Sequence, residues 1–237
     1  MNPAALSTPL GTLFPAGAVA ADLCGPGNPD LLLAGEAIYV GRAVPKRVQE
    51  FAAGRLCARR ALAEFGIVDF PVRVADDRQP IWPDSFVGSI THTEGYGAAV
   101  VAERRRIRAL GLDSEIVGQV KAPLWATICT MSEIAWLRSL PPSEQAAAAT
   151  VIFSAKEAFY KCQYPLTRER LNFLDAVVDG VTQPFSKGTF SIRSTRRIAL
   201  EDHAIMPLRG RYLFHDEEVT AGIAIPAAAG SDLCLIR

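Results

Sequence analysis

Two stretches of this sequence, one in each half, have the same layout. Residues 89–102 read SITHTEGYGAAVVA and residues 210–225 read GRYLFHDEEVTAGIAI. Each has the pattern of a strand, a short turn and a more apolar second strand, which is typical of a β-hairpin. Because each follows sequence with helical periodicity, the order of helices and then strands occurs twice. We therefore predict an α+β fold of two similar α/β halves, a pseudo-dimer within one chain, divided into residues 1–107 and 108–237.

The helices are expected where apolar residues recur every three or four positions. This pattern predicts a helix over residues 46–65, which ends at Gly66. It predicts two more over residues 122–140 and 144–163, separated by two prolines. A strand and a turn are expected at residues 72–83, and further strands at residues 109–112 and 188–194. The first 30 residues are rich in Ala, Pro and Gly, and we expect them to form a loosely packed lead-in.

Charge is balanced over the whole chain, with 25 Lys and Arg against 25 Asp and Glu. A general nucleic-acid binder is usually strongly basic, so we expect no nucleic acid as a partner. The balance hides a basic segment, because residues 42–60 hold one acid, Glu50, against six basic residues: Arg42, Lys46, Arg47, Arg55, Arg59 and Arg60. Guanidinium groups match the geometry of phosphate, so this segment is either a phosphate-binding element or an ordinary basic surface helix.

The N-terminal sequence and the cysteines bear on location. No Lys or Arg precedes Arg42, and no apolar run reaches about 18 residues, so we expect neither a secretory signal nor a membrane span. The cysteines are odd in number, and no two have CxxC spacing: Cys24, Cys57, Cys129, Cys162 and Cys234. We expect reduced, mostly buried thiols in a cytoplasmic protein.

Two short motifs contain candidate catalytic residues. In GLDSE, Asp113 and Glu115 are two positions apart, so on a strand their carboxylates point to the same side. Mg²⁺ takes carboxylate oxygens together with substrate phosphate, but a solvated strand end is the alternative. In FSAKEAFYK, Glu157 and Lys161 are one helical turn apart, with Lys156 next to Glu157. An ordinary salt bridge between Glu157 and Lys161 is the alternative there.

The order and spacing of all these features resemble one enzyme family. The basic helix is followed by WP…GSITHT, which contains His92, then by GLDSE, FSAKEAFYK and PLTRERLNFLDA. From residue 40 to residue 176 the chain looks like a phosphopantetheinyl transferase of the surfactin and enterobactin-synthetase type, with its active site at the interface between two pseudo-repeats. Such enzymes transfer the 4′-phosphopantetheine arm of coenzyme A to a serine of an apo acyl- or peptidyl-carrier protein and release adenosine 3′,5′-bisphosphate.

The resemblance implies a role for each acidic and basic residue of these motifs. Asp113, Glu115 and Glu157 are expected to hold Mg²⁺, or Mn²⁺ in its place, with the pyrophosphate of coenzyme A. Lys161 and Lys156 are expected to supply positive charge at the leaving phosphate. Glu157 is the expected base for the serine hydroxyl, either directly or through a metal-bound water, and a lysine is the other candidate base.

Further residues are assigned to coenzyme A by the same resemblance. The 3′-phosphate is expected to be bound by Arg47, Arg55 and His92, with Thr91 beside His92 in the same contact. Asp77 and Arg78 match the segment that binds adenine. Leu171 is expected near the pantetheine arm. Phe153 stands where the family usually has Trp, which keeps the packing but lacks the indole donor.

The alternative function is a catalytically inactive relative that binds coenzyme A or carrier proteins. The presence of all three acids and Lys161 favours the active enzyme. Another class of phosphoryl-transfer enzyme would need a GxxxxGK[ST] loop, which the sequence lacks. We expect a monomer whose partner is a carrier domain of a fatty-acid, polyketide, nonribosomal peptide or siderophore synthase. Residues 121–137, with Lys121, Leu124 and Trp125, are either part of its docking surface or core.

Overall fold

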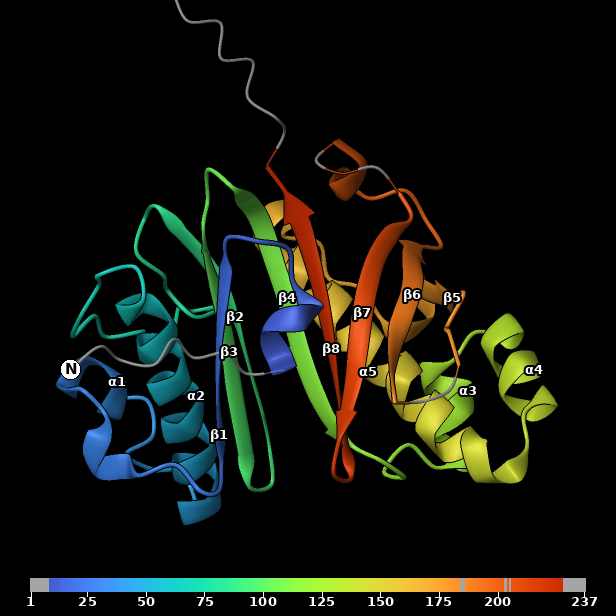
Figure 1. Cartoon of the computed structure of the whole chain (residues 1–237), viewed down its shortest axis with the longest axis horizontal. Coiled ribbons are helices and arrows are strands. Elements are labelled where there is room, and N and C mark those ends of the chain that lie inside the picture. The colour runs from blue at the N-terminus through green and yellow to red at the C-terminus, as the bar shows by residue number, and fades with distance from the viewer. Residues whose placement is uncertain (1–8, 184–185, 203, 205, 228–237) are drawn as a thin grey trace, which may run out of the picture.

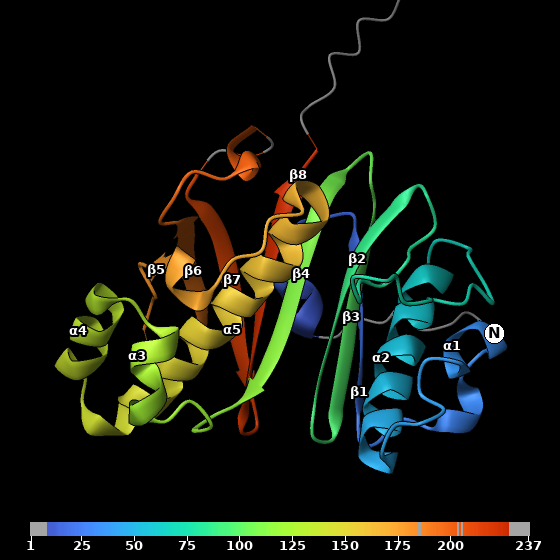
Figure 2. The ribbon, with the colours of Figure 1, turned by 180° about the vertical axis from the view of Figure 1, so that it is seen from behind.

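The computed structural model describes residues 9–183, 186–202, 204 and 206–227. Within these residues the chain forms two antiparallel sheets that lie side by side (Figure 1). The smaller sheet has the strand order β1–β3–β2 and the larger sheet has the order β4–β8–β7–β6–β5. Helices pack on both sheets (Figure 2), so the predicted α+β class is confirmed.

The strands of the smaller sheet are β1 (Ala18–Cys24), β2 (Phe86–Thr93) and β3 (Tyr96–Glu103). Those of the larger sheet are β4 (Ile107–Ile116), β5 (Ala176–Asp179), β6 (Lys187–Ser194), β7 (Leu208–His215) and β8 (Glu218–Pro226). The α-helices are α1 (Ala34–Ala37), α2 (Pro45–Ala63), α3 (Trp125–Ile128), α4 (Met131–Ser139) and α5 (Pro142–Thr167). Short 3₁₀ helices are η1 (Pro9–Leu13), η2 (Pro29–Leu31), η3 (Ala122–Leu124), η4 (Phe173–Asp175) and η5 (Ala199–Asp202).

The two long helices cover the same face of the molecule, α2 on the smaller sheet and α5 on the larger (Figure 2). Apolar residues of α2 such as Ala58 and Leu62 are fully buried against Val101 of β3. Both helices begin with a proline, which fits the first turn of a helix because its missing N–H would have no partner there. On the opposite face, η1 lies over the seam between the sheets (Figure 1).

The seam between the sheets is built from hydroxyl groups rather than from a backbone ladder. β2 and β4 are the facing edge strands, and they lie in close contact. The N–H of Leu112 donates to Ser89 Oγ at 3.0 Å, and the N–H of Ser114 donates to Thr91 Oγ1 at 2.9 Å. Two side chains of β2 therefore accept hydrogen bonds from the backbone N–H groups of β4 on either side of Asp113.

Several predicted elements are confirmed and three are wrong. The helices at 46–65 and 144–163 and both hairpins form, as α2, α5, β2–β3 and β7–β8. Residues 122–140 are broken into η3, α3 and α4, because Thr130 begins a new helix. Its hydroxyl accepts from the N–H of Glu133, and its own N–H donates to the Glu133 carboxylate. In residues 72–83 the expected turn forms, but in place of the expected strand there is a single bridge between Val74 and Pro80. The expected lead-in instead supplies η1 and β1.

The described part of the chain gives two results that bear on location. No helix in it has the length and hydropathy that crossing a bilayer requires. Four cysteines are free, of which Cys57, Cys129 and Cys162 are buried and Cys24 is exposed. The expected unpaired thiols are thus confirmed for these four, and Cys234 lies outside the described residues.

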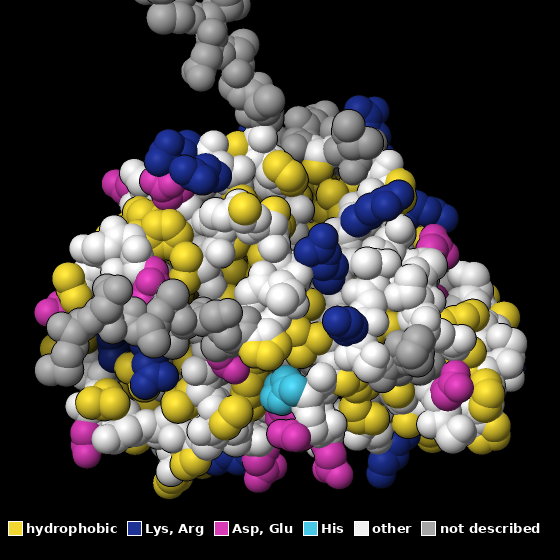
Figure 3. Space-filling view, in the orientation of Figure 1, with side chains coloured by type: hydrophobic (Ala, Val, Ile, Leu, Met, Phe, Trp, Pro, Cys, Tyr) yellow, Lys and Arg dark blue, Asp and Glu magenta, His cyan; other side chains and the backbone are white. Residues whose placement is uncertain are grey.

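On the face in Figure 3, basic and acidic side chains are interspersed.

Candidate active site

Asp113 is the centre of the acidic part of the site. Its side chain is 5% exposed on β4, and its Oδ1 accepts from Lys161 Nζ at 2.7 Å. Lys161 also donates to the backbone oxygen of Leu112 at 3.1 Å. The other oxygen, Asp113 Oδ2, is buried with no hydrogen-bond partner among the described residues. A buried carboxylate oxygen without a hydrogen-bond donor can bind a cation.

The strand and the helix bring the predicted acids together. Asp113 and Glu115 alternate with Ser114, whose hydroxyl shares a hydrogen bond of 2.8 Å with Thr220 on the neighbouring strand. Glu157 and Lys161 come from α5, and Lys161 pairs with Asp113, so the salt bridge between Glu157 and Lys161 is not the arrangement found.

Gly111 permits the close approach of the helix, because a Cβ there would lie 1.9 Å from the carbonyl oxygen of Ala158.

Burial raises the pKa of all three acids, and the charge of Asp113 raises that of Glu115 and Glu157 further. Burial, and then the charge of Asp113, raise the pKa of Glu115 to about 8. The pKa of Glu157 is raised for the same two reasons. Burial also raises the pKa of Asp113, although Lys161 opposes this shift. Packing three carboxylates in one partly dry site is therefore unfavourable unless positive charge is added.

These observations fit a hard divalent cation, which takes oxygen ligands and relieves repulsion between carboxylates. The unpartnered oxygen of Asp113 is the clearest sign. In the side-chain arrangement found, no three His, Cys, Asp or Glu of the described residues enclose an ion. Lys161 instead holds Asp113 Oδ1, so the ammonium provides the positive charge in this arrangement.

The basic part of the site contains the predicted pair of Arg47 and His92. Arg47 Nη1 on α2 lies 2.6 Å from His92 Nε2 on β2. Burial and then Arg47 lower the pKa of His92 to about 4, so the imidazole is neutral near pH 7 and accepts from the guanidinium. Glu50 Oε2 lies 3.7 Å from His92 Nδ1. The sequence-predicted arginine and histidine thus lie together, although they are 45 residues apart.

Arg55 is placed differently from Arg47. It is 7% exposed, donates through Nε to the backbone oxygen of Val72 at 2.7 Å, and lies over the ring of Phe51 at 4.1 Å. Burial lowers the pKa of Arg55 to about 10. No carboxylate in the described part of the chain forms an ion pair with it. The guanidinium is thus held in a largely dry position with no anion of its own.

Two assigned residues do not occupy the expected contacts. Thr91 neighbours His92 on β2, so their side chains leave the strand on opposite faces, and Thr91 is buried in the seam with Ser114. The sequence did not reveal this because it does not show which face of the strand meets β4. Thr91 therefore does not share the contact of His92.

Lys156 is also a correction. Its Nζ donates to Glu133 Oε2 at 2.7 Å and to the backbone oxygens of Ile128 and Phe173. All three N–H donors of the ammonium are thus used, and the side chain is 1% exposed. Because Glu133 comes from α4, residue spacing on α5 alone could not predict this pairing. The structure gives Lys156 no free donor for a phosphate.

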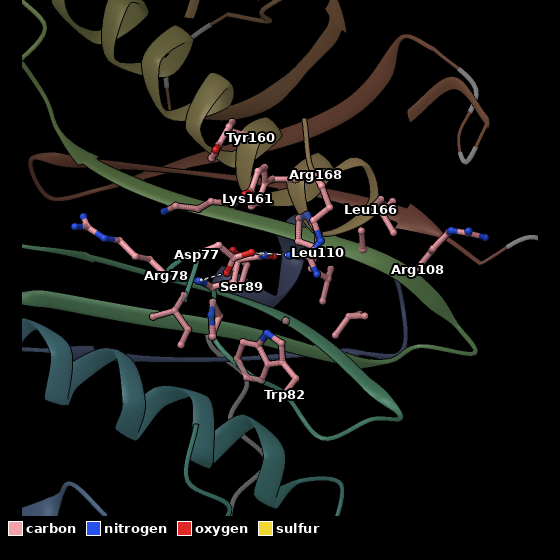
Figure 4. Close-up of a pocket in the computed structure, with 18 of the residues that line it drawn as sticks. Asp77, Arg78, Trp82, Ser89, Arg108, Leu110, Tyr160, Lys161, Leu166 and Arg168 are labelled. Atoms are coloured by element: carbon pink, nitrogen blue, oxygen red, sulfur yellow. Dashed lines mark hydrogen bonds and ion pairs between the residues drawn. The ribbon is translucent and has the colours of Figure 1, made fainter. Parts of the chain in front are cut away.

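A cavity of about 630 Å³ lies along the seam between the two halves (Figure 4). One wall is β2 with the loop that contains Asp77 and Arg78, and the other is the C-terminal part of α5 with Glu157 and Lys161. Asp77 Oδ2 accepts from Arg168 Nη1 at 2.6 Å across the cavity. A volume of this size suits a small organic ligand.

A second cavity of about 620 Å³ lies on the other side of Glu157. It contains Leu171, and it shares Glu157 and Tyr160 with the seam cavity. Sequence reasoning missed Tyr160, which the helical period could have identified because it is three residues after Glu157. Reasoning also missed Arg168, whose place depends on how α5 ends.

Comparisons with known proteins agree with this geometry. Residues 35–102 match the 4′-phosphopantetheinyl transferase N-terminal domain, and residues 109–217 match the 4′-phosphopantetheinyl transferase superfamily. The chain is 36% identical over 203 residues to 4′-phosphopantetheinyl transferase Svp of Streptomyces mobaraensis, which covers 85% of this chain and 81% of that protein.

Two further relatives match over a smaller share of their length. 4′-Phosphopantetheinyl transferase PptT of Mycobacterium tuberculosis is 39% identical over 143 residues, 60% of this chain and 62% of that protein. Enterobactin synthase component D of Salmonella typhi is 37% identical over 117 residues, 49% of this chain and 48% of that protein. The motifs, the two-half fold and these matches agree, and the chain belongs to the 4′-phosphopantetheinyl transferase superfamily.

Proposed function

We propose that this protein transfers the 4′-phosphopantetheine arm of coenzyme A to a serine of an apo carrier protein and releases adenosine 3′,5′-bisphosphate. One observation carries the proposal most directly. Glu157 lines both cavities, and Lys161, which lines the seam cavity, pairs with Asp113, whose other carboxylate oxygen has no partner among the described residues. The reacting phosphate of a long ligand that occupies both cavities would lie beside Glu157.

The acids are the proposed metal ligands. Asp113, Glu115 and Glu157 would hold Mg²⁺ or Mn²⁺, which when bound supplies positive charge to the pyrophosphate. Lys161 reaches the same place from α5 and is the proposed source of positive charge for the leaving phosphate. Lys156 has no donor to spare for that role.

Glu157 is the proposed general base. It lines both cavities, and its raised pKa makes it a better proton acceptor than an ordinary surface carboxylate. The serine hydroxyl of the carrier would approach from the side of the second cavity and lose its proton to Glu157 as the new bond to phosphorus forms. The bond that breaks is the one to the leaving adenosine phosphate.

The seam cavity is the proposed place for the nucleotide end of coenzyme A. Ile90 lines this cavity, and His92, which contacts Arg47, is two residues further along the same face of β2. His92 and the α2 residues Arg47 and Arg55 would therefore bind the 3′-phosphate. The loop with Asp77 and Arg78 would contact adenine. Leu171 and the second cavity would take the pantetheine arm.

The carrier is proposed to dock near the second cavity. Leu124 is 47% exposed and Lys121 is also exposed, so both are proposed members of the docking surface. Trp125 is 8% exposed and its Nε1 donates to Val120, so this residue belongs to the core. We propose a monomer, because the chain supplies both halves of the site, and we propose the cytoplasm as its location because its described thiols are free.

The test is incubation of the protein with coenzyme A, Mg²⁺ and a panel of apo carrier proteins, followed by intact-mass measurement. The expected result is a carrier heavier by one phosphopantetheine group on its serine. Glu157→Gln is expected to abolish the gain and keep coenzyme A binding. If no carrier gains mass while coenzyme A still binds, the chain is the inactive binding relative instead.

A further inference from the structure

Four residues other than glycine have a left-handed backbone in the described part of the chain: Asp69, Arg78, Arg168 and Asp216, with φ between 50° and 71°. Aspartate tolerates this conformation because its short side chain can bond locally. Arginine has no such compensation. The two arginines therefore occupy positions where their side chains do not improve the backbone, and a strained position of this kind points to a use for the side chain.

Glycine is the residue that both local structures favour. Arg78 closes a tight turn in which its N–H donates to the carbonyl of Ala75 at 2.8 Å, and the N–H of Ala75 donates to the carbonyl of Gln79. A glycine commonly takes the left-handed position of such turns. Arg168 ends α5, and its N–H donates to the carbonyl of Tyr164 at 2.9 Å. This is the position where glycine usually ends a helix.

The two arginines come from different halves but line the same cavity. Arg168 pairs with Asp77, the neighbour of Arg78, across that cavity (Figure 4). The lining carries six Lys and Arg side chains against two carboxylates. The cavity is therefore positively charged in an overall neutral protein, as a site for a highly anionic ligand requires.

We propose that Arg168 is a further binding residue for the nucleotide end of the ligand, a nucleoside bisphosphate, and that it closes the cavity from the side opposite Arg78, which the proposed function already places there. This inference rests on the proposed function. Both side chains lie at the exposed rim of the cavity, so they meet the ligand without being buried in advance. Asp77 holds Arg168 in place until a phosphate or a base offers a better partner. Arginine occupies each strained position because glycine, which would relieve the strain, has no side chain to contact the ligand.

The test separates stability from binding. Arg78→Gly and Arg168→Gly are compared with Asp69→Gly, which relieves the same backbone conformation at an exposed position outside the cavity. Arg209→Ala removes an exposed arginine from β7, which does not line the cavity. Each variant is measured by thermal unfolding of the free protein and by calorimetric titration with adenosine 3′,5′-bisphosphate. The KM for coenzyme A and kcat are also determined.

We expect both arginine variants to unfold at the wild-type temperature or above it, and their Kd for adenosine 3′,5′-bisphosphate to rise about tenfold, which corresponds to about 1.4 kcal/mol. The KM for coenzyme A is expected to rise in parallel while kcat stays within about twofold, because the reacting phosphate is not contacted. Asp69→Gly and Arg209→Ala are expected to bind as the wild type does.

Unchanged binding by Arg78→Gly and Arg168→Gly would overturn the inference and leave the proposed function intact. A clear loss of stability in Arg168→Gly would also overturn it, because the side chain would then serve the fold. A wild-type protein that binds neither adenosine 3′,5′-bisphosphate nor coenzyme A would contradict the proposed function as well.

Discussion

Lys156 and Lys161 lie on the same helix and show how little residue type says about role. Lys156 donates to one carboxylate and two carbonyls, whereas Lys161 is 29% exposed and pairs with Asp113, whose other carboxylate oxygen has no partner among the described residues. The sequence motif predicted that both would serve the phosphate. Spacing placed Glu157 and Lys161 on one helix face, and the family resemblance predicted that they share a site with Asp113. The prediction was wrong for Lys156, because its ammonium pairs with Glu133, which lies on another helix.

The contrast between the lysines gives the first prediction. Lys156→Met should lower the free energy of unfolding by about 3–5 kcal/mol, since it leaves the buried charge of Glu133 without its partner. Lys161→Met also leaves a buried carboxylate, that of Asp113, without its cation and should lower stability, but it should in addition lower kcat by about 100-fold or more. Urea unfolding and transfer rates measure the two effects.

The control for this prediction is the double variant Lys156→Met with Glu133→Gln. The neutral amide still accepts from the backbone N–H of Val178, so part of the lost stability should return. A Lys156→Met protein that is as stable as wild type would contradict the structural role assigned to the pair.

His92 gives a pH prediction. Its pKa is about 4 in the folded protein, against an ordinary value of 6.5, because it is buried and next to Arg47. Protonation therefore favours the unfolded chain, and stability present above pH 6.5 is lost as the pH falls toward 4, by about 2–3 kcal/mol in all. Urea unfolding of wild type and His92→Gln at pH 7 and pH 4.5 should show a smaller loss in the variant. Equal losses would exclude His92 as the cause.

At the scale of elements, the site depends on how closely α5 and β4 approach each other. The sequence predicted α5 and β4 at nearly the right residues, because the spacing of apolar residues along each segment can be read directly from the sequence. It could not predict that Ser89 and Thr91 would bond the edge of β4, since that requires knowing which strands become neighbours. It also merged α3 and α4, because their apolar pattern continues across the capping box at Thr130.

Gly111 is the most sensitive position in this packing. Gly111→Ala would place a methyl group 1.9 Å from the carbonyl oxygen of Ala158, so α5 must move away from β4. We expect a loss of about 1–3 kcal/mol in stability and a fall in kcat, because Glu157 and Lys161 move with the helix. Gly41→Ala is the matched control, since nothing lies within 4 Å of its added carbon. Full activity in Gly111→Ala would show that the approach is not required.

At the scale of the whole molecule, the N-terminal segment ties the two halves together. Arg211 Nη1 of β7 donates to the carbonyl of Thr12 at 2.9 Å, and Phe14 packs beside Gly222 of β8. The same segment continues into β1 of the smaller sheet. This role could not be predicted from the sequence, because an Ala-, Pro- and Gly-rich stretch lacks a clear period.

Phe14→Ala should therefore destabilise the protein as a whole. Phe14 is 5% exposed in the core between the sheets, and its removal is expected to lower the free energy of unfolding by about 3–5 kcal/mol. Far-UV and near-UV circular dichroism should report a single transition at a lower temperature. Two separate transitions in the variant would mean that the halves are stable without the segment.

The side chains that close the sheet edges have a consequence for solubility. An open strand edge invites pairing with a strand of another molecule, which is how many β proteins aggregate. Here Ser89 and Thr91 occupy the edge of β4, and Glu133 accepts from the N–H of Val178 at the edge of β5. An incoming strand must first displace them. Variants of Ser89 or Thr91 should therefore precipitate during expression as well as lose activity. Their hydroxyl groups both occupy the edge of β4 and hold the strand that carries Asp113.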